Sequence, residues 1–531
     1  MNGWERMRIQ KATLERLSRG FSTEAAATAS TTFAKSFESI PGPKPLPLIG
    51  NVWRYLPVIG QYKLDRLYDN AQLNRELYGP IVRELITPDH TILHLFDPND
   101  IETLFRLDGH CPHRRSHRAL LKYRHDRSSL YTDGGLFPEN GPNWQRQRKQ
   151  FQTRLMSKQQ VSLDTGKIDR CVRECLINRL SPTNDGDNTS VKSIPSLDTL
   201  LNEWAFASSL AVFLDTTLGE LDREEIRTTV EQLHNSLLAI DGTELHSDKW
   251  IKSAHKCKYY RLLIESQEHL HNFVSKRLQL IEDRSSVKQH QHQQQQPHHS
   301  FIEDWLLADK IDRKDVISFV IDALMAGYHT TTFTAAHLLY YLSLDSELRE
   351  QLRTQLPVPI VAGNSSSKRQ QLDAATVDSL DLLDRCLKET MRLNPVSIGT
   401  GRVVQNDDAI IRGYSVPRGT MVIAHTQCIS RDPKIFDEPD KFEPDRWVLY
   451  RTLKRTERPS AFANLPFGFG ARSCIGQRVA SMQIKVLAVR LIEHFDIEFG
   501  EQIQTKTTLI HNISKPIEVT VRRRQPRGSY D

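Results

Sequence analysis

The spacing of apolar residues predicts a chain that is mainly helical and carries only small β-sheets. A strand-like apolar run from Ile92 to Phe96 is followed, up to about residue 106, by residues with helical spacing. Long amphipathic helical patterns extend from about residue 142 to 284, interrupted by a polar turn over 184–190. A further apolar helical run extends from Val316 to Leu342. We therefore expect a mostly helical fold with a small sheet near the amino terminus.

Segments without such periodicity mark the edges of this helical body. Residues 40–47 contain four prolines and predict a rigid, polyproline-like entry to the fold. The tract 285–300 is rich in His and Gln and predicts a solvated low-complexity loop, and 357–371 predict another loop. The sequence shows no internal repeat. These features favour one catalytic domain over residues 40–525.

The first 39 residues have the composition of a mitochondrial transit peptide and flexible leader. Basic residues outnumber acidic ones between 1 and 20, and Ser, Thr and Ala dominate 22–32. A disordered tail without a targeting role is the alternative. The sequence has no run of about 18 apolar residues that could cross a bilayer. We expect a mitochondrial protein on the matrix side of the inner membrane.

Composition narrows the function classes. The net charge of +6 is mild, and no basic run is interleaved with aromatic residues, so a nucleic-acid partner is not expected. The seven cysteines are odd in number and scattered, which favours a reducing compartment over a disulfide framework.

One short stretch, residues 467–476, carries the most specific chemistry. It reads Phe-Gly-Phe-Gly-Ala-Arg-Ser-Cys-Ile-Gly and places Cys474 behind two glycines, Gly468 and Gly470. Glycines allow the backbone to lie close to a flat macrocycle, and turn N–H groups can point at the sulfur. A cysteine thiolate is one axial ligand of haem iron. The alternative is an ordinary glycine-rich turn with a buried cysteine.

This stretch resembles the haem-binding loop of cytochromes P450, and the resemblance covers about residues 40–525. It implies haem b (iron protoporphyrin IX) with Cys474 as the axial iron ligand and Phe467 in the loop. Arg472, Trp144, Arg148 and Arg402 are implied to hold the haem propionates, as arginine pairs well with carboxylates. Read singly, each of these is equally consistent with surface charge. In the family, residues matching Glu389, Arg392 and Arg446 form a buried triad that supports the haem loop.

A second motif, Ala326-Gly-Tyr-His-Thr-Thr331, lies in the apolar helical run and resembles the oxygen-activation segment of the family. The resemblance assigns Thr330 a catalytic role in oxygen activation. His329 stands where the family usually has an acid, and an imidazole can also relay protons near neutral pH. The alternative is a helical histidine that faces another helix.

The substrate and partners follow from the same resemblance. The chain is most similar to arthropod mitochondrial members that hydroxylate an ecdysteroid precursor by 22-hydroxylation. Electrons are then expected from NADPH through a ferredoxin reductase and an adrenodoxin-like ferredoxin, with O₂ as co-substrate. Ferredoxin docking is implied for Lys388 and Arg478, although Gln477 and Asp384 weaken that basic patch. Peripheral contact with the inner mitochondrial membrane is a further expectation. The candidate walls of an apolar substrate pocket, which are equally consistent with ordinary core, are Leu136, Phe137, Ala323, Gly327, Val396 and Ile398.

Alternative functions stay open at this stage. The chain is also consistent with a mitochondrial monooxygenase for xenobiotics or for another ecdysteroid position. A haem-thiolate isomerase would need no external electrons, and the presence of Thr330 argues against it. A non-catalytic haem sensor is the third class.

Overall fold

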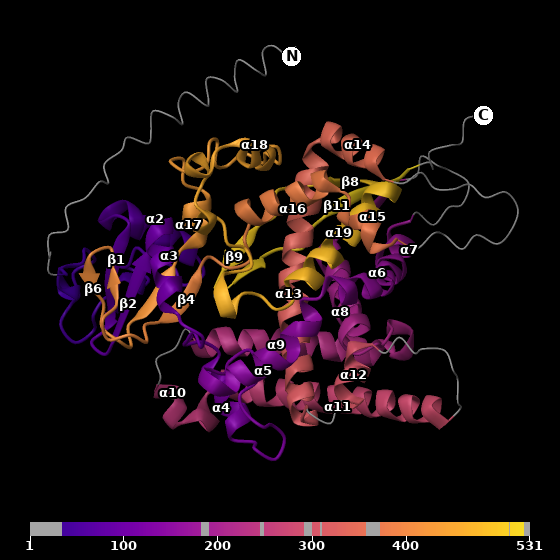
Figure 1. The fold of residues 1–531 in the computed structure, drawn as a ribbon, viewed down its shortest axis with the longest axis horizontal. Coiled ribbons are helices and arrows are strands. Elements are labelled where there is room, and N and C mark those ends of the chain that lie inside the picture. The colour runs from indigo at the N-terminus through magenta and orange to yellow at the C-terminus, as the bar shows by residue number, and fades with distance from the viewer. Residues whose placement is uncertain are drawn as a thin grey trace, which may run out of the picture.

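A computed structural model of the chain describes residues 34–181, 191–244, 249–290, 300–307, 311–356, 372–508 and 510–524. Most of these residues are helical, and the described strands form four small sheets (Figure 1). The expected class, mainly helical with small sheets, is confirmed.

The helices fall into an amino-terminal, a central and a carboxy-terminal group. The amino-terminal helices are α2 (Leu67–Tyr78), α3 (Pro98–Leu107), α4 (Arg118–His125), α5 (Gly141–Leu155), α6 (Lys158–Val172), a π-helical turn η3 (Arg173–Ile177) and α7 (Asn178–Leu180). The central helices are α8 (Leu197–Phe213), α9 (Arg223–Glu244), α10 (Lys249–Lys252), α11 (Lys258–His290), α12 (Phe301–Leu307), α13 (Arg313–Leu344) and α14 (Ser346–Gln355). The carboxy-terminal helices are α15 (Ala374–Asp378), α16 (Asp381–Leu393), α17 (Thr426–Ser430), α18 (Arg446–Thr452) and α19 (Gln477–His494).

The long helix α13 forms the centre of the molecule. It begins after Asp312, whose side chain accepts a hydrogen bond from the Lys314 N–H and so caps the helix. It packs against α8, α9 and α11 on one side and against α16 and α19 on the other (Figure 1). Its apolar run is buried in the largest hydrophobic core. The predicted apolar helix over 316–342 is therefore present and central.

The largest sheet lies beside α2 and α3 and has the strand order β1-β2-β7-β4 (Figure 1). Its strands are β1 (Ile81–Thr87), β2 (His90–Leu95), β7 (Met421–Ala424) and β4 (Thr400–Val403). The β2–β7 pair is parallel and the other two pairs are antiparallel. The predicted strand near 92–96 and the helix after it correspond to β2 and α3.

Three smaller sheets complete the fold. The strands β3 (Val191–Ile194), β11 (Val519–Arg523) and β8 (Phe495–Phe499) form an antiparallel sheet in that order. The other two are antiparallel hairpins, β5 (Ile410–Ile411) with β6 (Tyr414–Ser415) and β9 (Thr505–Thr507) with β10 (His511–Ile513).

Two predicted boundaries need correction. The folded body starts before residue 40, because Lys35 pairs with β6 through backbone hydrogen bonds to Gly413 and Ser415, and Phe37 is buried. At the other segment, α11 continues through His290, so the predicted loop 285–300 begins too early. The predicted transit peptide up to residue 33, the tract 291–299 and the loop 357–371 lie outside the described residues. None of the described helices is both long enough and apolar enough to span a bilayer.

Candidate functional site

The loop that carries Cys474 has the tight backbone that its glycines predict. Gly468 and Gly470 adopt φ angles of 70° and 72°, a region that glycine enters without strain. A short 3₁₀ turn over Gly470–Arg472 follows, and the Cys474 N–H donates to the Phe467 carbonyl at 2.8 Å. The loop ends where α19 begins at Gln477. The cysteine is therefore held immediately before the amino terminus of a long helix.

The surroundings of the Cys474 sulfur favour a bound metal over a free thiol. Backbone N–H groups of Gly476 and Gln477 donate toward the sulfur, and the nearby cation of Arg148 also favours the thiolate. Burial is the larger effect and raises the pKa of the Cys474 thiol, although the residue keeps accessible surface. Because the residue is exposed, its side chain is accessible to a group that binds beside the loop. Iron binding would deprotonate it there.

Four arginines gather beside this loop: Arg114, Arg148, Arg402 and Arg472. Burial and then the repulsion of the other guanidinium groups lower the pKa of Arg472 to about 8 and that of Arg114 to about 10. Within the described chain, Arg472 Nη1 and Arg114 Nε are buried without a hydrogen-bond partner. Buried cations without enough partners are costly, so this cluster suits an anionic group.

The contacts of the cluster leave little negative charge to offset it. Arg402 pairs with Asp108 at 2.6 Å, whereas Arg148 donates to the Ser473 carbonyl at 2.8 Å. Arg472 donates to the carbonyls of Pro112 and Glu139 and lies over the Trp144 ring at 3.9 Å. The chemistry of these groups fits a haem, whose two propionates would supply the missing carboxylates beside a thiolate ligand. Trp144, Arg148, Arg402 and Arg472 thus come together, with Trp144 stacked on Arg472.

Sequence reasoning missed Arg114, which belongs to the same cluster. It follows Pro112 in the connection between α3 and α4, and its backbone N–H and guanidinium bind Asn140 and the Phe137 carbonyl. The basic run His113-Arg114-Arg115 was the available signal, but a basic run outside a recognised motif usually indicates a solvated surface.

The predicted triad residues meet in a buried ion network. Arg392 donates to both carboxylate oxygens of Glu389, at 3.0 and 2.8 Å, and Arg446 donates to Glu389 at 2.8 Å. The side chains of Glu389 and Arg392 have no solvent exposure. The two arginines also bind backbone carbonyls of the segment that precedes the Cys474 loop, at Ser430, Asp437, Glu438, Pro439 and Lys441. The network therefore ties α16 and α18 to that segment.

On α13, Ala323, Ala326 and Thr330 keep partial exposure within a largely buried stretch of the helix. Ala323, Ala326 and Thr330 are spaced three and four residues apart, so they share one face. The Thr330 hydroxyl donates to the Ala326 carbonyl at 2.6 Å. This bond competes with the helical ladder at that point, a site where helices are known to bend. A hydroxyl is thus presented on a face of α13 that is not fully packed.

His329 is oriented toward another helix. Its Nε2 lies 3.3 Å from Nδ1 of His234 on α9. Burial, and then the neighbouring His234, lower the pKa of His329 to about 4. The expectation of an imidazole that titrates near neutral pH is therefore wrong, because desolvation penalises the imidazolium. His234 was not predicted, since a sequence does not show which helix faces α13 at this position.

Gly327, predicted as a pocket-wall residue, lies against α8. A Cβ built on it would lie 3.1 Å from Oγ of Ser209 on α8. The glycine therefore permits the close approach of α8 and α13. The sequence motif does not show which neighbouring helix Gly327 faces.

The segment that carries Leu136 and Phe137 is fixed to α13 by a carboxylate. Asp322 accepts the Phe137 N–H at 2.9 Å and pairs with Arg124 of α4 at 2.6 Å. Arg124 is fully buried and also donates to the Gly134 carbonyl. Asp322 was missed although it is the one carboxylate between Val316 and Leu342, a position where an unpaired charge is rarely tolerated. It positions the loop before α5.

Asp322→Asn tests this positioning role. The amide leaves the Arg124 cation buried without its counter-charge, so we expect a loss of about 3 kcal/mol in the free energy of unfolding. We also expect weaker binding of apolar ligands, because the 134–137 loop loses its anchor. Asp312→Asn is the matched control on α13, since asparagine caps a helix as well as aspartate. Denaturant titration and ligand-binding spectra measure the two effects. Equal stability and equal ligand affinity of the two variants would show that Asp322 does not position the loop.

The remaining candidate wall residues lie after α16. Val396 and Ile398 are partly buried, and their carbonyls accept N–H groups from His511 and Gln427. The segment is thus held by β10 and by α17.

The predicted docking residues are both exposed. Lys388 of α16 lies over the Trp447 ring, 3.8 Å from its centroid, and burial followed by repulsion from Arg451 lowers its pKa. Arg478 lies in the first turn of α19. The acidic neighbour Asp384 is paired with Lys485 at 3.1 Å, so it weakens the patch less than its sequence position suggests.

Comparisons with known proteins agree with this geometry. A sequence model of the cytochrome P450 family matches residues 40–521. "Cytochrome P450 302a1, mitochondrial" of Drosophila melanogaster is 31% identical over 506 residues, which cover 93% of this chain and 97% of that protein. The mitochondrial 1,25-dihydroxyvitamin D(3) 24-hydroxylase of Rattus norvegicus is 27% identical over 473 residues, which cover 87% of this chain and 84% of that protein.

A solved structure shares the fold. The retinoic acid-bound cyanobacterial CYP120A1 superposes with a TM-score of 0.68 at 18% identity, covering 92% of this chain and 100% of that chain. At this identity the similarity concerns the fold alone.

Proposed function

This chain belongs to the cytochrome P450 family, and on that premise we propose that it is a mitochondrial monooxygenase that hydroxylates an apolar steroid. The finer proposal is 22-hydroxylation of an ecdysteroid precursor, as in the arthropod enzyme called disembodied. The observation that carries the reaction class is the Cys474 thiol beside a cluster of four arginines that has one paired carboxylate, Asp108. The mitochondrial relatives, two of them named as hydroxylases of vitamin D compounds, support the steroid class.

The residues around the loop would hold the haem as follows. Cys474 would ligate the iron. The loop backbone at Phe467, Gly468 and Gly470 would bind the macrocycle. Arg148, Arg402 and Arg472, supported by Trp144, would bind the propionates, with Arg114 as a fourth cation. Bound haem supplies oxygen activation and the one-electron chemistry that side chains cannot perform.

Residues of α13 would take part in oxygen activation. The Thr330 hydroxyl can exchange its bond to the Ala326 carbonyl for a bond to a ligand above the loop. His329, neutral because its pKa is about 4, can accept a proton on one nitrogen and donate from the other through His234. Together they would form a path for protons between α9 and the active site.

A pH profile tests His329. Because its pKa is about 4, wild-type turnover should show no inflection from this group between about pH 6 and pH 8. In His329→Asp, a buried carboxylate titrates instead, and we expect the rate–pH curve to shift. His337→Gln, which changes another buried histidine of α13, should leave the curve unchanged. Identical curves for wild type and His329→Asp would exclude His329 from the proton path.

Electron delivery would use the exposed basic residues near α16 and α19. Lys388 and Arg478 would steer an acidic ferredoxin, an effect that acts on the encounter rate and falls with salt. At low salt, Lys388→Ala and Arg478→Ala should each slow reduction by ferredoxin several-fold, and the difference should vanish at high salt. Lys258→Ala is the control, because α11 lies on the opposite side of the molecule from α16 (Figure 1). Stopped-flow kinetics measure the rate of reduction by ferredoxin. Unchanged rates in both variants would exclude Lys388 and Arg478 from the ferredoxin interface.

Peripheral membrane contact is supported by an exposed apolar stretch. Eight large apolar residues between 46 and 64 are exposed, with Leu48 and Val58 at 90% and 93%. Exposed patches of this kind favour contact with a membrane or a protein. We propose the inner mitochondrial membrane as the partner.

The decisive experiment measures product. Purified holoprotein with ferredoxin, its reductase and NADPH should convert an ecdysteroid precursor to its 22-hydroxylated form, and a panel of steroids and xenobiotics should react less. Product formed without reductant would indicate an isomerase instead. Ligand-induced spectra without turnover would indicate a sensor, and a preferred xenobiotic would overturn the steroid assignment.

A further inference from the structure

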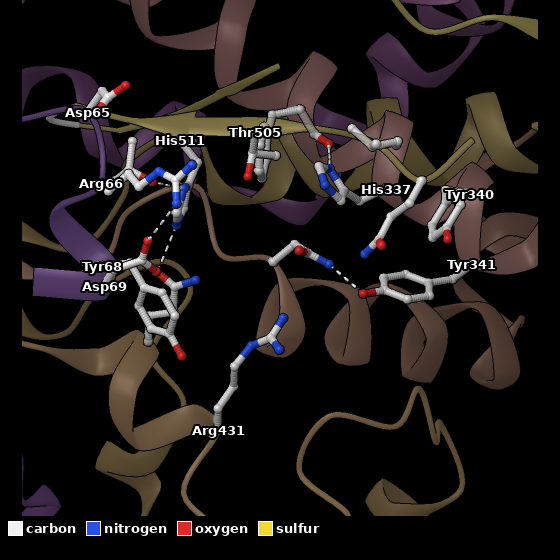
Figure 2. Close-up of a pocket in the computed structure, with 16 residues that line it drawn as sticks. Asp65, Arg66, Tyr68, Asp69, His337, Tyr340, Tyr341, Arg431, Thr505 and His511 are labelled. Carbon is white, nitrogen blue, oxygen red and sulfur yellow. Dashed lines mark hydrogen bonds and ion pairs between the residues drawn. The ribbon is translucent and has the colours of Figure 1, made fainter. Parts of the chain in front are cut away.

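A second pocket lies apart from the Cys474 loop, at the junction of α2, α13, α17 and the β9–β10 hairpin. Its cavity volume is about 360 Å³, which falls in the range of small-molecule sites. Figure 2 shows Asp65, Arg66, Tyr68 and Asp69 on one side and Tyr340 and Tyr341 on the other. The residues assigned to the haem or to the substrate do not line it.

Two buried side chains in this pocket have polar atoms left over. His337 donates Nδ1–H to the Phe333 carbonyl at 2.8 Å, and burial lowers its pKa to about 4, so Nε2 carries a free lone pair. Gln427 accepts from His511 through Oε1 at 2.7 Å, which leaves its Nε2–H₂ group to donate. Both residues are at least 95% buried, and among the described residues neither atom has a partner. A ligand that pairs with both atoms would form hydrogen bonds that the described chain does not make.

The charges of the pocket balance. The lining holds two cations, Arg66 and Arg431, and two carboxylates, Asp65 and Asp69, so its formal charge is zero. Burial also lowers the pKa of His511 to about 4, so neither histidine adds charge at neutral pH. A charged ligand would therefore gain no net attraction here. An uncharged ligand with hydroxyl groups, each able to donate and accept, matches the mixture of free groups.

Ring faces form the rest of the wall. Phe333 stacks on His511 with a centroid distance of 5.9 Å, and the rings of Tyr68, Tyr340 and Tyr341 also contribute. The Tyr340 hydroxyl has no partner among the described residues. Aromatic faces favour a flat or ring-shaped molecule over a flexible chain.

We propose that this pocket is a second binding site, for a small uncharged ring molecule that carries several hydroxyl groups. Two sources share this chemistry, a sugar or cyclitol and a polyhydroxylated steroid. The site is independent of the proposed reaction, because none of its residues takes part in oxygen activation.

One hydrogen bond links the border of this pocket to a candidate residue of the substrate pocket. The His511 N–H that borders the pocket donates to the Val396 carbonyl at 2.8 Å, and Val396 is a candidate wall of the substrate pocket. On the same hairpin, the Thr508 hydroxyl donates to Asp241 of α9 at 2.6 Å. Because the β9–β10 hairpin contacts both the pocket and Val396, the binding assay blocks the substrate side.

The test uses holoprotein whose haem iron is saturated with an azole inhibitor, so that further binding reports the second pocket. Sucrose and ecdysone represent the two sources, and glucose 6-phosphate and glucosamine are the charged comparisons. Saturable binding of sucrose, of ecdysone or of both is expected, by calorimetry or ligand-observed NMR, and identifies the source. No saturable binding of either, or tighter binding of a charged comparison, would overturn the proposal.

Two variants locate the binding. Thr505→Trp places an indole in the cavity from the exposed strand β9 and should weaken binding at least tenfold, whereas Thr354→Trp on α14 should not change it. Tyr340→Phe removes a single hydroxyl without changing the packing and should weaken binding about fivefold. Unchanged affinity in both Thr505→Trp and Tyr340→Phe, with thermal unfolding as in wild type, would place the ligand elsewhere.

Discussion

Replacing Arg392 with alanine should give a protein that does not accumulate in a folded, haem-loaded form. Removing this guanidinium leaves the Glu389 carboxylate fully buried, with Arg446 as its one remaining cationic partner. Breaking a buried ion pair from one side costs about 3–5 kcal/mol, and a domain has only about 5–15 kcal/mol of stability. The carbonyls of Ser430 and Pro439 lose the Arg392 donor as well, and the Lys441 carbonyl keeps only Arg446. Soluble yield, haem content and denaturant unfolding measure the effect.

Arg385→Ala is the matched control for this prediction. Arg385 lies on the same helix and also pairs with carboxylates, but its partners Asp381 and Asp445 are 55% and 76% exposed. Solvent screens such pairs, so the variant should lose less than about 1 kcal/mol. If Arg392→Ala kept wild-type stability and haem content, the network would not support the fold.

Some of the predicted parts of the site have a geometry that their spacing along the chain determines. Cys474 and its glycines lie within one loop, and Glu389 and Arg392 lie one helical turn apart. Thr330 sits within the α13 motif in the same way. For such local sets, the residue pattern and the helix period together fix which groups meet. The long apolar helix and the small sheet beside α3 were predictable for the same reason.

Contacts between elements distant in sequence were predicted only where the family resemblance supplied them, as for Arg446 with Glu389. The Asp322–Arg124 pair joins residues 198 positions apart, and the His329–His234 pair joins residues 95 apart. The pattern of α13 shows that Asp322 is unusual, but it does not show which cation neutralises it. The directions of Gly327 and His329 depend on where α8 and α9 pack, which is a property of the tertiary fold. The pKa of His329 follows from that packing and could not be read from its residue type.

Replacing Cys474 with alanine should abolish the reaction while leaving a folded protein. The sulfur is the one side-chain ligand that the loop offers to iron, and the Gly476 and Gln477 N–H groups that point at it have no substitute acceptor in an alanine side chain. Without the thiolate, electron density no longer favours O–O cleavage, so turnover should fall to background. The reduced, carbon monoxide-treated protein should lack the red-shifted Soret maximum of thiolate ligation. Any haem that stays bound would be held by the arginine cluster without a cysteine ligand.

Cys257→Ala is the control for loss of a thiol, because Cys257 lies at the start of α11, outside the Cys474 loop, and is only partly buried. It should keep the wild-type spectrum and activity. Cys386 and Cys428 are poor substitutes as ligands, since burial raises the pKa of each thiol to about 12 and keeps it protonated. A thiolate-type Soret maximum that persisted in Cys474→Ala would therefore require a different fold around the iron. The same result would remove the basis for the arginine cluster as a propionate site, because both depend on a macrocycle that lies against this one loop.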